Sequence, residues 1–228
     1  MHAQLQMGVS TMRAIILGAT GMVGQSVLRE CLLDDDVENV LSIGRNQLDQ
    51  QHHKLMDIVQ PNLLDLSRLE DVLSGYDACF FCLGVSSAGL TEERYRIITY
   101  DITISVAQTL SKLNPQMTFL YVTGSGTDST EKGRVMWARV KGKTENDLLR
   151  LPFKAAYMFR PGIILPLNGI KSKTKLYQVI YDILKPLYPW LKRLTTVTTT
   201  EQCGRAMIKV ARFGYSKPII ESNEINHI

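Results

Sequence analysis

A glycine-rich turn near the start of the sequence is the feature best suited to bind a ligand. Residues 18–24 read GATGMVG, the spacing G-x-x-G-x-x-G, and follow a short β-branched run at residues 13–17. Gly18 allows a strand to turn, Gly21 lets a pyrophosphate approach the backbone, and Gly24 lets a helix pack closely on the sheet. The N-terminus of that helix supplies free N–H groups and a positive dipole to phosphates.

The turn therefore predicts dinucleotide binding, and the alternative is a tight turn without a ligand. The expected cofactor contacts in this segment are Gly18, Thr20, Gly21, Met22, Val23 and Gly24.

The end of the second expected strand bears on which dinucleotide binds. An Asp or Glu at this place accepts hydrogen bonds from the ribose 2′-hydroxyl of NAD. Residues 42–45 read Ser-Ile-Gly-Arg and contain no carboxylate, whereas Arg45 could pair with a 2′-phosphate in a bidentate manner. We expect NADP, with NAD still possible because an Arg after a strand is also ordinary solvated surface. Asp65 and Leu66, after the third strand, are placed to meet the adenine, and a helix N-cap is the other role open to Asp65.

Strands and helices alternate along the chain. Apolar and β-branched runs predict strands at residues 13–17, 37–43, 55–59, 77–83, 119–123 and 155–159. Helical spacing predicts helices after Gly24 and at residues 67–73, 93–113 and 135–149, the first of these three opened by a capping box of Ser67 and Glu70.

Alternation of this kind predicts right-handed β-α-β units and an α/β fold: a doubly wound parallel sheet, Rossmann-like, with helices on both faces. We expect residues 1–11 to be a disordered tail or tag. Residues 12–228 would form a single NAD(P)-binding domain, in which residues 166–228 contribute a small C-terminal cap on the substrate side.

Composition excludes several classes of protein. The 228 residues are 45% hydrophobic and 21% charged, which is close to the globular average and argues against disorder and fibrous repeats. The excess of 26 basic over 22 acidic residues is too small and too dispersed to predict nucleic-acid binding. No apolar run is long enough to span a bilayer, and residues 1–11 do not resemble a secretory signal, so a cytoplasmic protein is expected.

Cysteine and histidine give no metal or disulfide pattern. Cys79 and Cys82 spell C-x-x-C, but they lie in an expected buried strand, where residues three apart point to opposite faces. They are expected to be small core residues rather than a redox or metal pair. The four histidines fall in expected loops or tails, and no structural metal is predicted.

An amphipathic segment follows in the last third of the chain. Lys171, Lys173 and Lys175 precede an apolar stripe at helical spacing that Pro186 and Pro189 end. The stripe consists of Leu176, Val179, Ile180, Ile183, Leu184 and Leu187. A helix that covers the substrate cleft or docks on the sheet is the more usual use of such a pattern, and a membrane-surface or partner-binding helix is the alternative.

Four segments in this order resemble the short-chain dehydrogenase/reductase superfamily, in its atypical branch. They are GATGMVG at residues 18–24, LLDLSRLEDVLSGYDACFFCLG at 63–84, VKGKTE at 140–145 and FRPGIIL at 159–165. The chain looks most like the Tat-interacting-protein type of oxidoreductase-like proteins. The resemblance implies an NAD(P) site in which Leu83 and Gly84 line the cofactor and Pro161 and Gly162 lie near the nicotinamide.

The catalytic unit that the resemblance implies is incomplete. The superfamily uses a Ser together with a Y-x-x-x-K pair, and here Lys141 matches the Lys while Trp137 occupies the Tyr position. An indole N–H donates a hydrogen bond but cannot exchange a proton at neutral pH. Lys141 would still hold the nicotinamide ribose. The Ser position falls near Thr123 or Ser125, either of which could polarise a substrate or simply form a turn.

Two functions follow as hypotheses. The first is an NADP-dependent oxidoreductase or epimerase that acts on a small carbonyl or alcohol, with Tyr95, Tyr100 or Tyr121 as conceivable substitutes for the missing phenol. The second is a catalytically impaired cofactor-binding sensor or protein-interaction module, which Trp137 favours. In either case we expect a monomer or homodimer without stable membrane insertion. The substrate itself depends on variable loops that the dinucleotide half does not determine.

Overall fold

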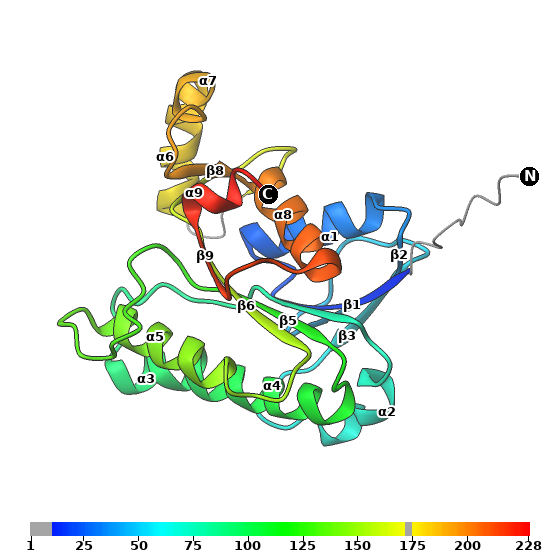
Figure 1. Ribbon diagram of the computed structural model, residues 1–228. Coiled ribbons are helices and arrows are strands. Elements are labelled where there is room, and N and C mark those ends of the chain that lie inside the picture. Colours follow the sequence, from blue (N-terminus) through cyan, green and yellow to red (C-terminus); the bar gives the residue numbers. More distant parts are fainter. Residues whose placement is uncertain (1–10, 172–174) are drawn as a thin grey trace, which may run out of the picture.

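Seven parallel strands form the central sheet of the computed structural model, which describes residues 11–171 and 175–228. All neighbouring pairs run parallel, from one edge strand to the other (Figure 1). Across the sheet the strands are β3 (Leu55–Val59), β2 (Val37–Gly44), β1 (Met12–Leu17), β4 (Ala78–Phe81), β5 (Thr118–Val122), β6 (Ala155–Arg160) and β9 (Ile219–Glu221). The doubly wound α/β fold expected from the sequence is confirmed.

The strand order reverses direction between β1 and β4. From β1 the chain first builds outward through β2 to β3, and it then returns to add β4, β5 and β6 on the other side. The connections on the two sides of this point diverge, which leaves a crevice outside the carboxyl ends of β1 and β4. Ligands of open α/β sheets bind in such a crevice, and the glycine turn directly after β1 lies there.

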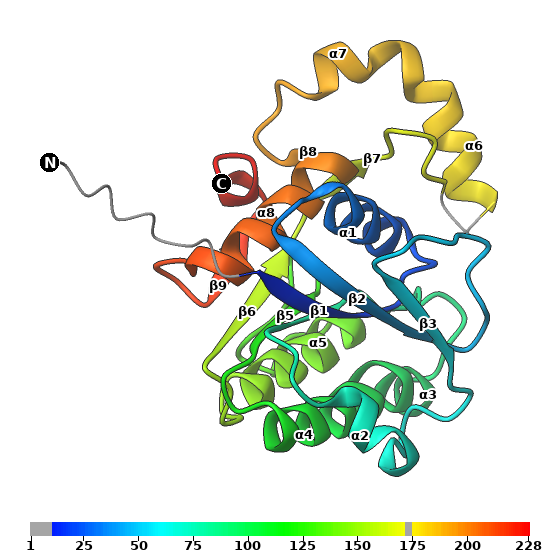
Figure 2. The same cartoon turned by 90° about the vertical axis from the view of Figure 1, so that its right-hand side faces the viewer.

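Helices cover both faces of the sheet (Figures 1 and 2). One face carries α1 (Met22–Leu33) and α8 (Thr200–Phe213), and the other carries α2 (Glu70–Leu73), α3 (Glu92–Arg96), α4 (Ile102–Leu113) and α5 (Met136–Leu148). Side chains alternate along each strand, so that Ile16 and Phe80 belong to the α1 side of the core while Ile15 and Cys79 belong to the α4 side. As expected, Cys79 and Cys82 point to opposite sides of the sheet, and burial raises the pKa of both thiols.

Helices α1 and α8 pack very closely together. A Cβ atom on Gly204 would lie 2.8 Å from the Ser26 hydroxyl oxygen, so no larger residue fits in α8 at this place without displacement. The Ser26 hydroxyl in turn donates to the buried backbone carbonyl of Thr200. This contact joins the start of the chain to its last third.

Local details differ from the expected elements in three places. The fourth strand is limited to Ala78–Phe81, because the chain beyond it turns away into the crevice. The long helix expected at residues 93–113 is present but contains a π-helical turn, Ile97–Asp101, between α3 and α4. The predicted capping box of Ser67 is wrong: a 3₁₀ turn, Ser67–Leu69, precedes α2, and Asp65 accepts the Ser67 backbone N–H instead (3.0 Å).

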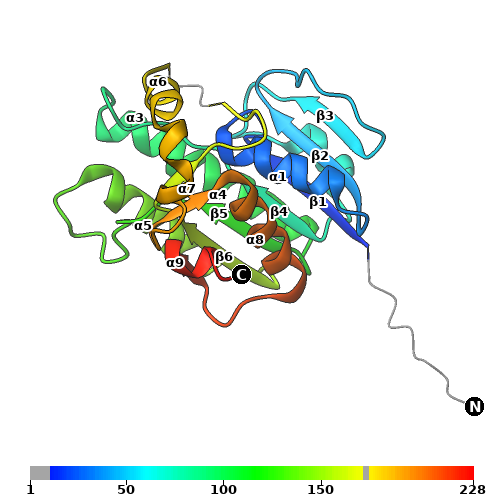
Figure 3. The same cartoon turned by 90° about the horizontal axis from the view of Figure 1, so that it is seen from above.

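The last third contributes to the body of the fold as well as to a projecting segment. A short parallel pair, β7 (Ile163–Leu165) and β8 (Val197–Thr199), carries the projecting segment of α6 (Lys175–Leu184), a 3₁₀ turn (Lys185–Leu187) and α7 (Tyr188–Leu191). By contrast α8, β9 and α9 (Ser222–Ile225) pack on or join the central sheet. Figure 3 shows α6 and α7 above the sheet and away from β3.

Some expectations fall outside the described residues. The predictions for residues 1–10 and for Lys173 are of this kind. Thr11 is the first residue that the structure describes, and its hydroxyl donates to the Glu38 carboxylate (3.3 Å). Among the residues that the structure describes, no helix is long and apolar enough to cross a membrane. The same residues contain no group of three or more His, Cys, Asp or Glu side chains that could hold a metal ion.

Candidate coenzyme site

The glycine turn between β1 and α1 is shaped by two close backbone contacts. Gly18 adopts a φ of +84°, and a Cβ atom there would lie 2.7 Å from the backbone nitrogen of Leu83 after β4. A Cβ on Gly24 would lie 2.1 Å from the carbonyl oxygen of Gly18. Any larger residue at either place would push α1 away from the sheet, so these two glycines let the helix begin directly above the strand ends.

The N-terminus of α1 is open to an anion. Gly21 is its N-cap, no side chain caps the first turn, and the first turn contains no acidic residue. The Gly21 N–H closes the turn by donating to the Gly18 carbonyl oxygen (2.9 Å). The first hydrogen bond within the helix is donated by the Gln25 N–H to the Gly21 carbonyl oxygen (2.8 Å). The N–H groups of Met22, Val23 and Gly24 therefore remain available, which is the arrangement that binds phosphate.

A cavity of about 320 Å³ opens at the carboxyl ends of β1, β2 and β4. At Gly84 a Cβ would meet nothing within 4 Å, so the space above this residue is open. The cavity contains no carboxylate, and its one charged residue is Arg45. It is lined by Gly18, Ala19, Thr20, Gly21, Ser42, Gly44, Arg45, Asn46, Leu48, Cys82, Leu83, Gly84, Val85 and Ser86.

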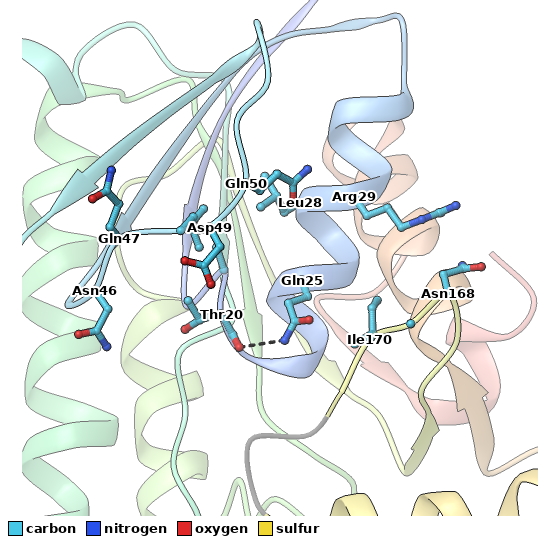
Figure 4. Close-up of a pocket in the computed structure, with 13 residues that line it drawn as sticks. Thr20, Gln25, Leu28, Arg29, Asn46, Gln47, Asp49, Gln50, Asn168 and Ile170 are labelled. Carbon is cyan, nitrogen blue, oxygen red and sulfur yellow. Dashed lines mark hydrogen bonds between the residues drawn. The ribbon is translucent and has the colours of Figure 1, made fainter.

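A second and larger cavity, about 750 Å³, adjoins the first and shares four lining residues with it: Ala19, Thr20, Asn46 and Leu48. Figure 4 shows it between α1 and the loop after β2, with the amide of Gln25 donating to the Thr20 carbonyl (3.0 Å). Asp49 is the one carboxylate among its lining residues. The two cavities together form a trough that runs from the strand ends past the glycine turn.

Arg45 is exposed at the rim of the first cavity. Within the described chain its guanidinium makes no ion pair or hydrogen bond to protein, so it is available to a ligand. Asp65 and Leu66 do not line either cavity. The Asp65 carboxylate accepts the Ser67 hydroxyl (2.7 Å) and N–H, which lowers the pKa of Asp65, and the Leu66 side chain is buried in the core. The structure thus brings Arg45 to the glycine turn and gives Asp65 a local role at the start of a helix.

Lys141 and Trp137 project from the first two turns of α5 toward the end of β5. The Lys141 ammonium donates to the backbone carbonyl of Thr123 (2.5 Å). Burial lowers the pKa of Lys141 to about 8, and the carboxylate of Glu145 opposes this shift by favouring the charged form. The Trp137 ring lies against the turn after β5, 3.6 Å from the position of a Cβ on Gly126.

The Thr123 hydroxyl faces away from solvent. It donates to the Glu145 carboxylate (2.6 Å) and also lies 3.1 Å from the carbonyl oxygen of Phe159. Its partner Glu145 is fully buried and forms a two-point ion pair with Arg160, whose Nε lies 3.1 Å from Oε1 and whose Nη2 contacts Oε2. Thr123 is thus tied into a buried network, and its hydroxyl is not free to reach a substrate.

Ser125 is the exposed hydroxyl of the same turn. Its backbone N–H donates to the carbonyl of Pro161 (2.9 Å), which brings the loops after β5 and β6 together. On the other side of this junction, a Cβ on Gly162 would lie 2.4 Å from the Thr196 carbonyl oxygen. Ser125, Pro161 and Gly162 are therefore neighbours, at the carboxyl ends of the strands where Lys141 also lies.

The Glu145–Arg160 pair was not predicted from the sequence. Both residues lie inside segments that resemble the superfamily, VKGKTE and FRPGIIL, so the signal was present. Nothing in their separation of 15 residues indicates that they meet, because the contact exists only once α5 has packed beside β6. The available clue was Arg160, a charged residue at the end of the otherwise apolar strand β6.

None of the three candidate tyrosines takes the place of the missing phenol. Tyr95 and Tyr121 are almost completely buried, and burial raises the pKa of each phenol. The Tyr100 hydroxyl donates to the Asp147 carboxylate (2.7 Å), on the outer side of α5. None of the three lies on the turn that carries Ser125.

The residues present fit a dinucleotide. The two glycines whose Cβ positions are filled by backbone, the uncapped helix N-terminus and the open space above Gly84 form a cradle for a diphosphate. The bases and riboses of a dinucleotide would occupy the remainder of the trough that the two adjoining cavities form.

Comparison with known proteins agrees with this geometry. A protein family described as NAD(P)H-binding matches residues 18–148, more than half of the chain. The chain is 29% identical over 213 residues to protein FMP52-2, mitochondrial, of Scheffersomyces stipitis, covering 92% of this chain and 89% of that protein. It is 27% identical over 153 residues to protein HTATIP2 of Rattus norvegicus, covering 66% and 62%.

Solved structures share the fold at low sequence identity. The enzyme WbmF of Bordetella bronchiseptica in complex with NAD+ has a TM-score of 0.67 at 12% identity, covering 96% of this chain and 77% of that one. A short chain dehydrogenase family protein of Francisella tularensis has a TM-score of 0.63 at 13% identity, with coverage of 94% and 98%.

The same comparisons correct the expected location. Similar proteins are named mitochondrial, among them those of Scheffersomyces stipitis and Eremothecium gossypii, so the expectation of a cytoplasmic protein is wrong. That expectation depended only on the lack of a secretory or membrane-spanning pattern, which does not separate the cytoplasm from an organelle. The family match covers more than half of the chain, and the relatives and the solved structures agree with it. The chain therefore belongs to the NAD(P)H-binding proteins and has the short-chain dehydrogenase fold.

Proposed function

We propose that this chain binds NADP(H) in the trough at the glycine turn and acts as an oxidoreductase on a small carbonyl or alcohol. The observation that carries the choice of coenzyme is Arg45, the one charged residue of a cavity without carboxylates. A guanidinium at the end of β2 pairs with a ribose 2′-phosphate, and nothing in that cavity repels it. Asp49, in the adjoining cavity, is the residue that would instead favour the 2′-hydroxyl of NAD.

The other contacts are assigned by their place along the trough. The proposed diphosphate contacts are Gly18, Thr20, Gly21, Met22, Val23 and Gly24. Leu83 and Gly84 would lie along the cofactor, and Pro161 and Gly162 near the nicotinamide. Asp65 and Leu66 line neither cavity and receive no cofactor contact in this proposal. Lys141 would hold the nicotinamide ribose, and Ser125, whose hydroxyl is exposed, would orient the substrate oxygen. When bound, the coenzyme supplies or accepts a hydride.

Arg45→Ala tests the proposed coenzyme. Loss of the charge-assisted contacts to a 2′-phosphate should weaken NADPH binding about 10- to 100-fold and change NADH binding less than about threefold. Calorimetric titration of both coenzymes measures this directly. Arg29→Ala is the matched control, because Arg29 lines the adjoining cavity but pairs with Glu30.

Asp49→Asn tests the alternative, which is that the chain is specific for NAD. If the chain is built for NAD, this substitution should weaken NADH binding, and Arg45→Ala should leave NADPH binding unchanged. That pair of results would overturn the proposal for NADP. If neither coenzyme binds the unmodified chain, the proposed function as a whole fails.

Lys141 predicts a pH dependence of coenzyme binding. Because burial lowers its pKa to about 8, the ammonium is charged below that pH and increasingly neutral above it. NADPH affinity should therefore be highest below about pH 8 and decrease as the pH rises through this value. Titrations between neutral and alkaline pH measure the decrease. Lys141→Met should bind weakly at every pH, with no decrease near pH 8.

Lys143→Met is the matched control for this experiment. Lys143 lies two residues further along α5, where it pairs with Asp147 (2.9 Å) on the outer side of the helix. It should retain the full affinity and the same pH dependence. A decrease near pH 8 that persists in Lys141→Met would assign the titration to another group.

A second function, a cofactor-binding sensor or interaction module, is favoured by one observation. Trp137 replaces the proton donor of the superfamily, and the three candidate tyrosines are buried or bonded elsewhere. In that case the chain would bind NADPH in the same way without turning it over. The two functions share the coenzyme site and differ only in the step that needs a proton.

A further inference from the structure

The projecting segment of α6 and α7 exposes an apolar stripe. Its members are large apolar side chains that each expose between 41% and 70% of their surface: Val179, Ile180, Ile183, Leu187, Trp190 and Leu194. From position 180 they recur at intervals of three and four residues along α6, the 3₁₀ turn and α7, and Leu194 lies three residues after α7 ends. We refer to these six residues as the outer stripe.

A different set of side chains holds the segment to the protein. Leu184, Tyr188 and Leu191 pack with Leu165 of β7 and Val197 of β8 in a small core of their own. The Tyr188 hydroxyl also donates to the carbonyl of Tyr181 (3.2 Å). Since docking uses this inner side, the outer stripe is not needed to attach the segment. Figures 1 and 2 show α6 and α7 projecting from the end of the body beyond α8 and β8.

Basic residues accompany the outer stripe. Residues 175–194 contain four basic residues and one acidic residue, Asp182, which pairs with Lys185 (2.8 Å). Lys192 and Arg193 follow Trp190 by two and three residues in the sequence and are exposed, and no carboxylate of the described chain pairs with either of them. Lys192 also lines a shallow cavity with Leu167 and Val197. The surface therefore combines an apolar stripe, a tryptophan and cations that lack anionic partners.

We propose that the outer stripe rests on the surface of an anionic lipid bilayer. An interfacial helix buries its apolar face among the acyl chains near the headgroups, and its basic residues attract anionic lipids. Tryptophan favours this boundary because its ring is apolar and its N–H can stay hydrated. Ile183 and Trp190, with 70% and 60% of their surface exposed, would enter deepest, while Lys192 and Arg193 would contact the lipid phosphates.

Charge favours this occupant over a second protein. A protein partner at a helical stripe covers mainly apolar area, which would leave Lys192 and Arg193 without a function, whereas a bilayer that contains anionic lipid pairs with both. The segment is too short and too interrupted by Pro186 and Pro189 to span the membrane. The proposed contact is therefore with one leaflet of the bilayer only. It does not depend on whether the chain catalyses a reaction with its coenzyme.

Cosedimentation with lipid vesicles tests the proposal. The full chain should sediment with vesicles of phosphatidylcholine mixed with phosphatidylglycerol, and much less with phosphatidylcholine alone. Ile183→Asp combined with Trp190→Glu should abolish the binding. Lys192→Glu combined with Arg193→Glu should weaken binding to the mixed vesicles at least about tenfold, and high salt should act in the same direction.

Phe213→Asp is the matched control. Phe213 exposes 75% of its surface at the end of α8, outside the outer stripe, and its substitution should leave sedimentation unchanged. Tryptophan fluorescence gives a second readout: vesicles should shift the emission to shorter wavelength in the unmodified chain and not in Trp190→Phe. NADPH binding, measured on the same variants, should be retained and shows that they are folded.

Three results would overturn the proposal. One is absence of sedimentation with the mixed vesicles. Another is equal sedimentation of the unmodified chain and the Ile183→Asp, Trp190→Glu variant. The third is that the unmodified chain is a dimer that does not bind vesicles, whereas the Ile183→Asp, Trp190→Glu variant is a monomer. This result would show that a second copy of the chain covers the outer stripe instead.

Discussion

Replacing Trp137 by tyrosine is expected to raise the rate of NADPH-dependent carbonyl reduction by about 10²- to 10⁴-fold, the usual contribution of a general acid. Trp137 and Lys141 are four residues apart on α5 and share a face of the helix. A phenol at position 137 would therefore lie beside the ammonium, which favours the phenolate and so tunes the phenol as a proton donor. The indole now present can donate a hydrogen bond but no proton.

The measurement is the decrease in NADPH absorbance with small aldehydes and ketones, for the unmodified chain and for Trp137→Tyr. Trp137→Phe is the control, because it changes the ring without adding a proton donor and should not gain activity. Calorimetry should show similar NADPH affinity in all three. A gain that requires tyrosine would mean that the natural chain uses the coenzyme mainly as a ligand.

The opposite outcome is equally informative. If the unmodified chain already reduces a carbonyl, Trp137→Tyr adds nothing and Lys141→Ala is inactive, then the oxidoreductase proposal stands with a proton donor other than position 137. The exposed Ser125 and the Lys141 ammonium, whose pKa is lowered to about 8, would then be the groups to examine.

The first three strands could be predicted because their signals are local. The apolar runs at residues 13–17, 37–43 and 55–59 correspond to β1, β2 and β3 within one residue at each end. The glycine turn was equally clear, because a strand before it and a helix after it leave few other uses for that spacing. In these segments each residue's own preference agrees with its place in the sheet.

The last strand could not be predicted in the same way. β9 has three residues, Ile219–Glu221, and becomes a strand because β6 provides an open edge for it. β7 and β8 are equally short and pair only with each other. Three residues carry no periodicity, so the tertiary partner decides their structure.

Competition between neighbours explains the incorrect helix start. Ser67 and Glu70 have the spacing of a capping box, but Asp65 lies two residues upstream, and its carboxylate takes both the Ser67 hydroxyl and N–H. A carboxylate is the stronger acceptor, so the chain makes a local turn and begins α2 three residues later.

The roles of hydroxyls at the site depend on packing that the sequence does not display. Thr123 and Ser125 were equivalent candidates in the sequence, since both follow β5. In the structure the Thr123 hydroxyl is enclosed because Glu145 and Phe159 approach from two other elements, while Ser125 stays exposed beyond the turn. Residues distant along the chain thus decide which hydroxyl can meet a substrate.

Glu145→Ala is expected to lower the free energy of unfolding by about 3–5 kcal/mol, the usual cost of removing one partner from a buried ion pair. Glu145 is fully buried, and the substitution would leave Arg160, of which the side chain is only 10% exposed, without its two-point partner. Glu221, which also contacts Arg160 (3.1 Å), is half exposed and can compensate only in part. Urea denaturation at neutral pH measures the change.

Two controls separate the buried charge from the mere loss of a contact. Glu92→Ala breaks an exposed pair with Arg139 and should cost less than about 1 kcal/mol. The double variant Glu145→Met, Arg160→Met removes both charges and should be markedly more stable than Glu145→Ala, because no unpaired charge remains buried. If Glu145→Ala cost no more than Glu92→Ala, water would have to reach Arg160 freely, and the network would not hold Thr123 and the turn before α5 in place.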